Sequence, residues 1–274
     1  MPSVLTAPEL NLSLRLFDVD QINQINQQEK TCKPTNNEIE KKILNADAYE
    51  VMQQIASNSI DLVLTDPPYA ISRPTGFKSV KNGLKRFAVS MDFGDWDQTE
   101  IDLKRLSQDL FRIIKPSGTV IVFYDLWKIT NLASALEVAG FKQLRFIEWV
   151  KTNPVPLNSK RNYLTNSREI AVLAVKGGKP VFNDSYHNGI YSYPIPNGKG
   201  RDKRIHPTQK PLSLFEDLIE KHSQEGAVVF DPFLGSGTTA VAAIGKNRDF
   251  FGCEKDEEYY KAAKNRILNF YSDK

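Results

Sequence analysis

The sequence predicts an α/β protein with a doubly wound, mostly parallel sheet of seven strands. First, short apolar runs with the length of buried strands alternate with segments whose apolar residues recur at helical spacing. Second, two of these runs end in tight turns, at positions 66–69 (DPPY) and 231–239 (DPFLGSGTT). Third, no internal repeat or clear linker divides the chain. Because open α/β sheets bind ligands at strand ends, we expect the two turns at one rim of the sheet.

The composition is that of an ordinary globular protein, with 41% hydrophobic and 25% charged residues among 274. No apolar run approaches the roughly 20 residues of a membrane span, and the first residues do not resemble a secretory signal. We therefore expect a cytoplasmic protein without membrane contact. Cys32 and Cys253 are too few for a disulfide framework, and the histidines show no ligand spacing with them, so no metal site is expected.

Three segments lack a regular period. Residues 1–40, rich in Asn and Gln, are expected to be a poorly determined lead-in to a single domain at 41–274. Residues 70–97 are punctuated by glycines, and a loop of this length inside a compact domain is typically functional, so a mobile loop is expected. Residues 179–205, rich in Gly, Pro, Asn and Tyr, are expected to form an irregular insertion.

The regular elements follow one another between these segments. Caps and breakers set their limits: Thr99 is expected to cap a helix, residues 115–118 (KPSG) to end it, and Gly140 to end the next. Pro154 and Pro156 restrict the strand before them to residue 150. Strands are expected at 42–45, 60–65, 119–124, 141–150, 169–175, 227–230 and 248–253. Helices are expected at 48–56, 99–114, 126–139, 212–222, 236–245 and 257–270.

The turn at 66–69 carries the residue types needed to transfer a group to the amino nitrogen of a nucleobase. An exocyclic amine is a poor nucleophile because its lone pair is delocalised into the ring. Two acceptors on its N–H bonds, the Asp66 carboxylate and the Pro67 carbonyl, would favour a pyramidal, more nucleophilic nitrogen. Pro67 and Pro68 keep this backbone rigid, and the Tyr69 ring can stack on a flat base.

The second turn carries the residue types that bind an adenosine-containing cofactor. Gly235 and Gly237 permit a tight turn, and Glu254, about 20 residues later, can accept hydrogen bonds from ribose hydroxyls. An acid before the turn, Asp231, would repel a pyrophosphate but attract an ammonium or sulfonium group. A dinucleotide site would also place a third glycine where Ala240 stands. S-adenosylmethionine is therefore favoured over a nicotinamide cofactor, with a purely structural glycine turn as the alternative.

Together the motifs resemble the β class of S-adenosylmethionine-dependent DNA amino-methyltransferases, in which DPPY precedes a DPFxGSGT-type turn. The resemblance extends over residues 43–268 and implies a Rossmann-like methyltransferase fold with a circularly permuted motif order. Asp47, at another strand end, would contact the cofactor or serve only as a helix N-cap. Lys210 lies in a family-like stretch beside the cofactor, 206–211 (HPTQKP). The implied contacts of S-adenosyl-L-methionine are Asp47, Lys210, Asp231, Phe233, Gly235, Gly237, Thr238 and Glu254.

The same resemblance implies contacts with DNA. Trp149 matches a family segment near the target base and would form a wall of its pocket, the alternative being a tryptophan buried in the core. The insertion at 179–205 lies where the class carries its target-recognition segment. Two basic clusters flank the candidate site and are expected to contact phosphates. Their candidate residues are Arg73, Lys85, Arg86, Lys199, Arg201, Lys203 and Arg204.

Aspartate at position 66 favours the N6 amino group of adenine as the target, so we expect a site-specific DNA adenine-N6 methyltransferase. The nearest alternative is a cytosine-N4 enzyme. RNA or a protein glutamine amide is a more distant substrate, since glutamine enzymes usually carry Asn before Pro-Pro-Tyr. A nucleic-acid-binding relative without turnover is the non-enzymatic alternative. The family also implies a homodimer and a cognate restriction endonuclease, unless the enzyme is solitary.

Overall fold

The computed structural model describes residues 36–69, 101–154, 164–196 and 208–272. The loop predicted at 70–97 lies outside these residues, as do residues 1–35 of the predicted lead-in and 197–205 of the predicted insertion. Within the described part, no helix combines the length and the apolar character that crossing a bilayer requires. The last residues of the predicted lead-in are helical (α3, Asn36–Lys42), because Ile39 anchors them in the core at 1% exposure.

The described residues form an eight-stranded sheet in the order β1-β8-β7-β2-β3-β5-β4-β6. Neighbouring strands are parallel except at β5, which runs antiparallel to both β3 and β4. The predicted doubly wound, mostly parallel sheet is therefore confirmed, with one strand more than expected. The strands are β1 (Ile43–Asn45), β2 (Ile60–Thr65), β3 (Ile114–Tyr124), β4 (Lys142–Lys151), β5 (Arg168–Val175), β6 (Ile190–Tyr193), β7 (Val228–Asp231) and β8 (Asp249–Glu254).

The additional strand, β6, lies inside the segment predicted to be irregular. It has four residues and pairs in parallel with β4, Trp149 opposite Tyr191. Of these four residues Tyr191 is buried, at 3% exposure. So short a strand between glycine- and proline-rich flanks shows no readable alternation, and its pairing with a distant strand defines it.

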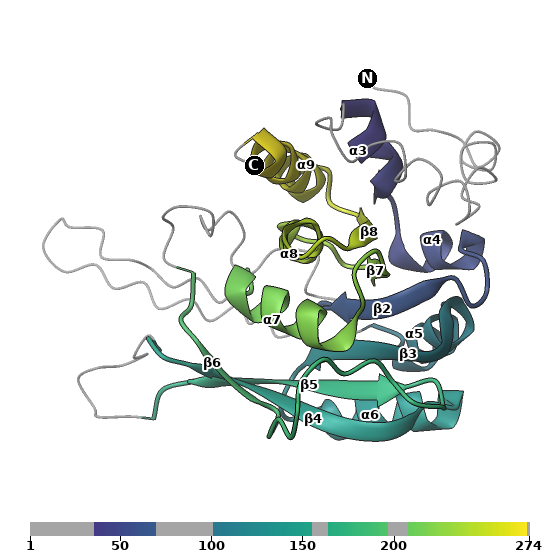
Figure 1. The fold of residues 1–274 in the computed structure, drawn as a ribbon, viewed down its shortest axis with the longest axis vertical. Helices are drawn as coiled ribbons and strands as arrows, with labels where there is room; N and C mark the ends of the chain where they lie inside the picture. The colour runs from purple at the N-terminus through teal and green to yellow at the C-terminus, as the bar shows by residue number, and fades with distance from the viewer. Residues whose placement is uncertain (1–35, 70–100, 155–163, 197–207, 273–274) are drawn as a thin grey trace, which may run out of the picture.

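Helices cover both faces of the sheet, as the fold class requires. One core cluster joins the sheet to α7, α8 and α9, and a second joins it to α4, α5 and α6. Figure 1 shows α7 in front of the sheet and α6 behind it. On β2, Leu62 and Leu64 face the first cluster while Val63 faces the second. The helices are α4 (Ala48–Gln54), α5 (Leu103–Ile113), α6 (Ile129–Ala139), α7 (Leu212–His222), α8 (Thr238–Gly245) and α9 (Glu257–Ser272).

Both ends of α5 differ from the prediction. Asp102 caps α5, its side chain accepting a hydrogen bond from the Arg105 N–H at 2.9 Å. The predicted cap, Thr99, lies outside the described residues. Residues 115–118, predicted to be a turn, form the irregular start of β3, where Ser117 has φ +67° and the register with β2 shifts. Ile114 and Thr119 pair with β2 on either side of this segment, so the segment interrupts the pairing within one strand.

Candidate active site

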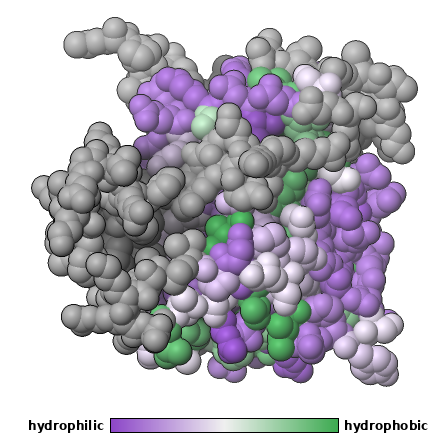
Figure 2. Space-filling model, turned by 90° about the vertical axis from the view of Figure 1, so that its left-hand side faces the viewer, coloured by the Kyte–Doolittle hydropathy of each residue, from purple (hydrophilic) through white to green (hydrophobic). Residues whose placement is uncertain are grey.

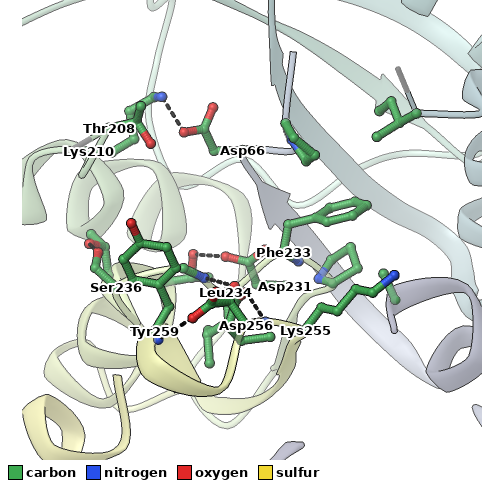
Figure 3. A pocket seen from close by; sticks show the side chains of 18 of the residues that line it. Asp66, Thr208, Lys210, Asp231, Phe233, Leu234, Ser236, Lys255, Asp256 and Tyr259 are labelled. Carbon is green, nitrogen blue, oxygen red and sulfur yellow. Dashed lines mark hydrogen bonds and ion pairs between the residues drawn. The ribbon is translucent and has the colours of Figure 1, made fainter. Parts of the chain in front are cut away.

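The two predicted turns lie at the same rim of the sheet. β2 and β7 are adjacent parallel strands, so the residues that follow them emerge side by side. The Thr65 hydroxyl donates a hydrogen bond to Asp231 at 2.6 Å, which ties the two strand ends together. Asp66 and Asp231 line one cavity of about 700 Å³. Figure 3 shows Asp66 at one end of this cavity and Tyr259 at the other.

A carboxylate from β8 accepts a hydrogen bond from the glycine turn that follows β7. Gly235 has φ +52°, and its N–H donates to Glu254 Oε2 at 2.8 Å. Glu254 Oε1 accepts from the Asp256 N–H at 2.9 Å, so one side chain joins the turn to the start of α9. A Cβ on Gly235 would meet nothing closer than 3.9 Å, which leaves room for a ligand. At Gly237, φ +75°, a Cβ would lie 3.2 Å from Ala263, so this glycine permits close helix packing.

Asp231 is buried, at 4% exposure, and its carboxylate organises the turn. Besides the Thr65 hydroxyl, it accepts hydrogen bonds from the Thr239 hydroxyl at 2.5 Å and the Phe233 N–H at 3.0 Å. Burial raises the pKa of Asp231 to about 6, although these hydrogen bonds act in the opposite direction. A carboxylate held by neutral donors keeps its negative charge, and such a charge inside a cavity attracts a cationic ligand.

Asp47 was predicted to contact the cofactor or to serve only as a helix N-cap. It is the N-cap of α4, accepting from the Tyr49 N–H at 3.0 Å, and it also lines the cavity. Lys255 pairs with its carboxylate at 3.2 Å. Phe233 and Thr238 line the same cavity.

A chain of charged side chains begins at the other end of the cavity, which Asp66 and Lys210 line. Lys210 pairs with Asp66 and, at 2.9 Å, with Glu169 at the beginning of β5. Lys151 pairs with the other Glu169 oxygen at 2.7 Å. The Tyr69 hydroxyl donates to Asp66 Oδ1. Lys210 was predicted as a cofactor contact, and in the structure its ammonium group pairs with Asp66, the candidate catalytic carboxylate. Figure 3 shows the Lys210 side chain pointing to Asp66.

Burial and ion pairing shift the pKa values of these groups in different directions. Burial raises the pKa of Asp66, with Lys210 opposing the shift and Glu169 adding to it. Burial also raises the pKa of Tyr69 well above its ordinary value. For Glu169, burial is outweighed by Lys210 and Lys151, which leave its pKa below the ordinary value. For Lys210, burial is outweighed by Asp66 and Glu169, so its pKa is raised.

Trp149 lies in the core, apart from the cavity. Its side chain is 2% exposed, packs in the cluster that contains α7, and donates its indole N–H to the Tyr193 carbonyl at 2.9 Å. The pairing of β4 with β6 covers it. A base cannot stack on a ring in this position, so the predicted pocket wall is instead a core residue. The predicted phosphate contacts Arg73, Lys85, Arg86, Lys199, Arg201, Lys203 and Arg204 lie outside the described residues.

Glu169 and Lys151 are site residues that sequence reasoning missed. Glu169 reaches this rim because β5 is antiparallel, so its first residues lie beside the carboxyl end of β3, with Tyr124 opposite Ile170. The sequence does show a charged residue, Glu169, at the start of an apolar strand. It does not show the direction of that strand in the sheet. Among the described residues, no group of three or more His, Cys, Asp or Glu side chains is arranged to hold a metal ion.

Comparison with known proteins identifies the family. A DNA methylase family model matches residues 60–265. The chain is 35% identical over 243 residues to the type II methyltransferase M2.LlaDCHI of Lactococcus lactis subsp. cremoris, covering 82% of this chain and 88% of that protein. It belongs to the N6_N4_Mtase family of DNA methylases. This methyltransferase is also 34% identical over 258 residues to the type II methyltransferase M2.DpnII of Streptococcus pneumoniae, covering 86% and 92% of the two chains.

Solved structures agree with this assignment. The crystal structure of the M1.HpyAVI–SAM complex superposes on the methyltransferase with a TM-score of 0.60 at 31% identity, covering 82% of this chain and 98% of that one. The cytosine-N4-specific PvuII DNA methyltransferase, at 17% identity and a TM-score of 0.62, shows the shared fold. The methyltransferase uses S-adenosylmethionine to methylate DNA. Its cavity suits that cofactor, with carboxylates from Asp231 and Glu254 beside an open glycine turn.

Proposed function

We propose that this methyltransferase modifies the N6 amino group of adenine in DNA, with Asp66 as the acceptor for that amine. The main support for the proposal is the position of Asp66. It lies at one end of a cavity that the glycine turn after β7 also lines. A base amine placed against Asp66 would therefore face the cofactor. Aspartate before Pro-Pro-Tyr supports adenine over cytosine.

Asp66 and the Pro67 carbonyl would each accept one N–H of the amine, which localises the nitrogen lone pair as the N–C bond forms. S-adenosylmethionine, which Asp231 and Glu254 would help to hold, would supply the electrophilic methyl group as a sulfonium with a neutral thioether as leaving group. The nitrogen then loses one proton, and Asp66 is suited to receive it because burial raises its pKa. The two prolines keep the acceptors in place, so positioning provides much of the rate.

Tyr69 is proposed to stack on the flipped base. Its ring makes an edge contact with Tyr124, with ring centroids 5.4 Å apart, and this fixes its plane. The basic residues at 73, 85, 86, 199, 201, 203 and 204 are proposed to contact phosphates. Figure 2 views the molecule from the left-hand side of Figure 1, towards which β2 points, and the described surface there is hydrophilic mainly at the top and right, with apolar patches in the middle and at the bottom. The hydrophilic part fits DNA, whose protein interfaces are polar.

The type II relatives support a cognate restriction endonuclease as a partner, and a homodimer is proposed from the family. A cytoplasmic location is part of the proposal, since the substrate is DNA. Both partners are testable by co-purification and by sedimentation.

The deciding experiment measures transfer of labelled methyl groups to DNA, followed by digestion to identify the modified nucleoside. We expect N6-methyladenine from the wild type and a loss of at least about 10²-fold in Asp66→Ala, with S-adenosylmethionine affinity within a few-fold of normal. Asp249→Ala is the matched control, since Asp249 also pairs with a lysine, Lys42 at 2.8 Å, but begins β8 at the opposite rim. N4-methylcytosine as product, or activity retained in Asp66→Ala, would overturn the proposal.

A further inference from the structure

The proposed amine acceptor is already engaged by two donors of the protein itself. Lys210 pairs with Asp66 Oδ2, and the Tyr69 hydroxyl donates to Oδ1. Lys210 is 5% exposed and lies over the rings of Tyr69 and Phe123, with Nζ 5.7 and 5.3 Å from the ring centroids. An amine that enters this site must therefore share or displace a buried ammonium group.

Glu169 gives that ammonium group a second partner. Its Oε2 lies 2.9 Å from Lys210 Nζ, while its Oε1 is held by Lys151 at 2.7 Å. Lys151 is itself fixed over the Trp149 ring, 5.2 Å from the centroid, so the carboxylate has a stable place on the sheet. Three N–H donors on one ammonium can serve two carboxylates and can shift between them over a short distance.

We propose that Lys210 is a positioning residue whose ammonium group bridges Asp66 and Glu169 and passes to Glu169 when the base amine binds Asp66. We name Lys210, Asp66 and Glu169 the lysine bridge. The inference rests on the proposed function, in which Asp66 receives the amine. The lysine bridge keeps Asp66 charged and in place, and Glu169 holds the lysine once Asp66 has taken the amine. Leaving a buried ammonium without a partner would be costly, so the second carboxylate makes the exchange feasible.

The charged groups around Asp66 determine what each substitution should do. Lys210 lowers the Asp66 pKa and Glu169 raises it, against a background of burial that raises it. Replacing Lys210 should therefore raise the Asp66 pKa, whereas neutralising Glu169 should lower it. Among the described residues, the groups that face this carboxylate are Tyr69, Glu169, Lys210 and Asp231, while Lys151 faces Glu169 and Asp125 faces Tyr69.

The first test follows the pH dependence of methyl transfer in Lys210→Met and Glu169→Gln. Because the Asp66 carboxylate must be ionised to accept the amine, the acid limb of kcat/KM should move to higher pH in Lys210→Met and to lower pH in Glu169→Gln, by at least about one unit. Glu169→Gln should also lose about tenfold in kcat, since Lys210 then has only Asp66 to bind. Lys210→Arg should keep the wild-type limb because it keeps the charge.

Lys42→Met is the matched control, because Lys42 also pairs with one carboxylate and lies over a ring, Phe250, at 5.6 Å. It should lower stability without moving the acid limb. A lysine bridge that only stabilises the fold would lower activity in both site variants and leave their pH limbs unmoved, which would overturn the proposal.

A second readout does not depend on turnover. Carboxyl-carbon NMR of the protein without cofactor or DNA follows the titration of Asp66, which should shift upwards in Lys210→Met and downwards in Glu169→Gln. Unchanged titration in both variants would remove the lysine bridge, whatever the activity. Suppose instead that the variants show these shifts but the wild type transfers no methyl group to DNA. In that case the proposed function fails, and the exchange of Lys210 on amine binding fails with it. The lysine bridge in the protein without substrate would still be established.

Discussion

The two ends of the cavity hold their carboxylates in different ways. At the cofactor end, Asp231 and Glu254 accept hydrogen bonds from neutral donors, which are threonine hydroxyls and backbone N–H groups. At the catalytic end, Asp66 and Glu169 pair with the ammonium groups of two lysines. Neutral donors leave the negative charge in place, while a lysine partner cancels it.

This difference separates the two binding events. At the cofactor end, Asp231 and Glu254 present uncompensated negative charge, while Asp47 pairs with the exposed Lys255. A cationic ligand can therefore bind Asp231 and Glu254 without displacing a protein cation. The catalytic end is internally neutralised, so the proposed substrate amine would have to share or displace a protein cation there. We therefore expect cofactor affinity to depend on charge and pH, and base binding to depend on the lysine bridge.

The largest expected effect at the cofactor end comes from Glu254→Ala. The substitution removes the acceptor of the Gly235 N–H and the proposed ribose contact, so we expect S-adenosylmethionine affinity to fall by about 10²-fold, as for loss of hydrogen bonds to a charged group. Isothermal titration calorimetry measures it. Glu254→Gln keeps one acceptor oxygen and should lose less. Normal affinity in Glu254→Ala would mean that this carboxylate only supports the turn, and the contrast between the two ends would weaken.

A smaller effect is expected from pH. Because burial raises the pKa of Asp231 to about 6, this group becomes protonated as the pH falls through 6 and its attraction for a cation is lost. A cationic cofactor favours the ionised form, so its affinity should fall by about tenfold from pH 7 to pH 5, with proton release on binding near pH 6. Calorimetry in two buffers of different ionisation enthalpy detects that proton. Affinity that is flat between pH 5 and pH 7 would show that Asp231 does not sense the ligand.

The cofactor end could be predicted from the sequence because it is built locally. A strand, a glycine turn and a helix are contiguous in residues 227–245, and the next strand ends at Glu254. Alternating strands and helices then place Asp66 at the same rim, since parallel neighbours share their carboxyl ends. These inferences need only the order of elements.

The catalytic end could be predicted only in part because it depends on non-local pairing. Glu169 joins the site through the reversed direction of β5, and Lys210 turns towards it across a separation of 41 positions in the chain numbering (210 − 169). Trp149 is buried because β6, a strand that local pattern does not reveal, pairs beside it. The sequence therefore predicted correctly that this tryptophan lies on a strand. It did not predict that the ring is buried in the core and apart from the cavity.

The smallest expected effect tests those surroundings. Trp149→Phe keeps an aromatic ring in the core but loses one hydrogen bond to the Tyr193 carbonyl, which still accepts from the Thr152 N–H at 3.2 Å. Because the smaller ring also leaves a cavity, we expect the free energy of unfolding to fall by about 1–3 kcal/mol. Methyl transfer should stay within about twofold of the wild type at a temperature where both proteins are folded, since the ring is 2% exposed and lies apart from the cavity. Chemical denaturation gives the first quantity and steady-state kinetics the second. A raised KM for DNA with unchanged stability would reverse this assignment, because a base wall affects substrate binding and a core residue affects folding. The outcome thus decides which residues of β4 take part in the catalytic end. Either both Trp149 and Lys151 take part, or only Lys151, whose ammonium group lies over the Trp149 ring.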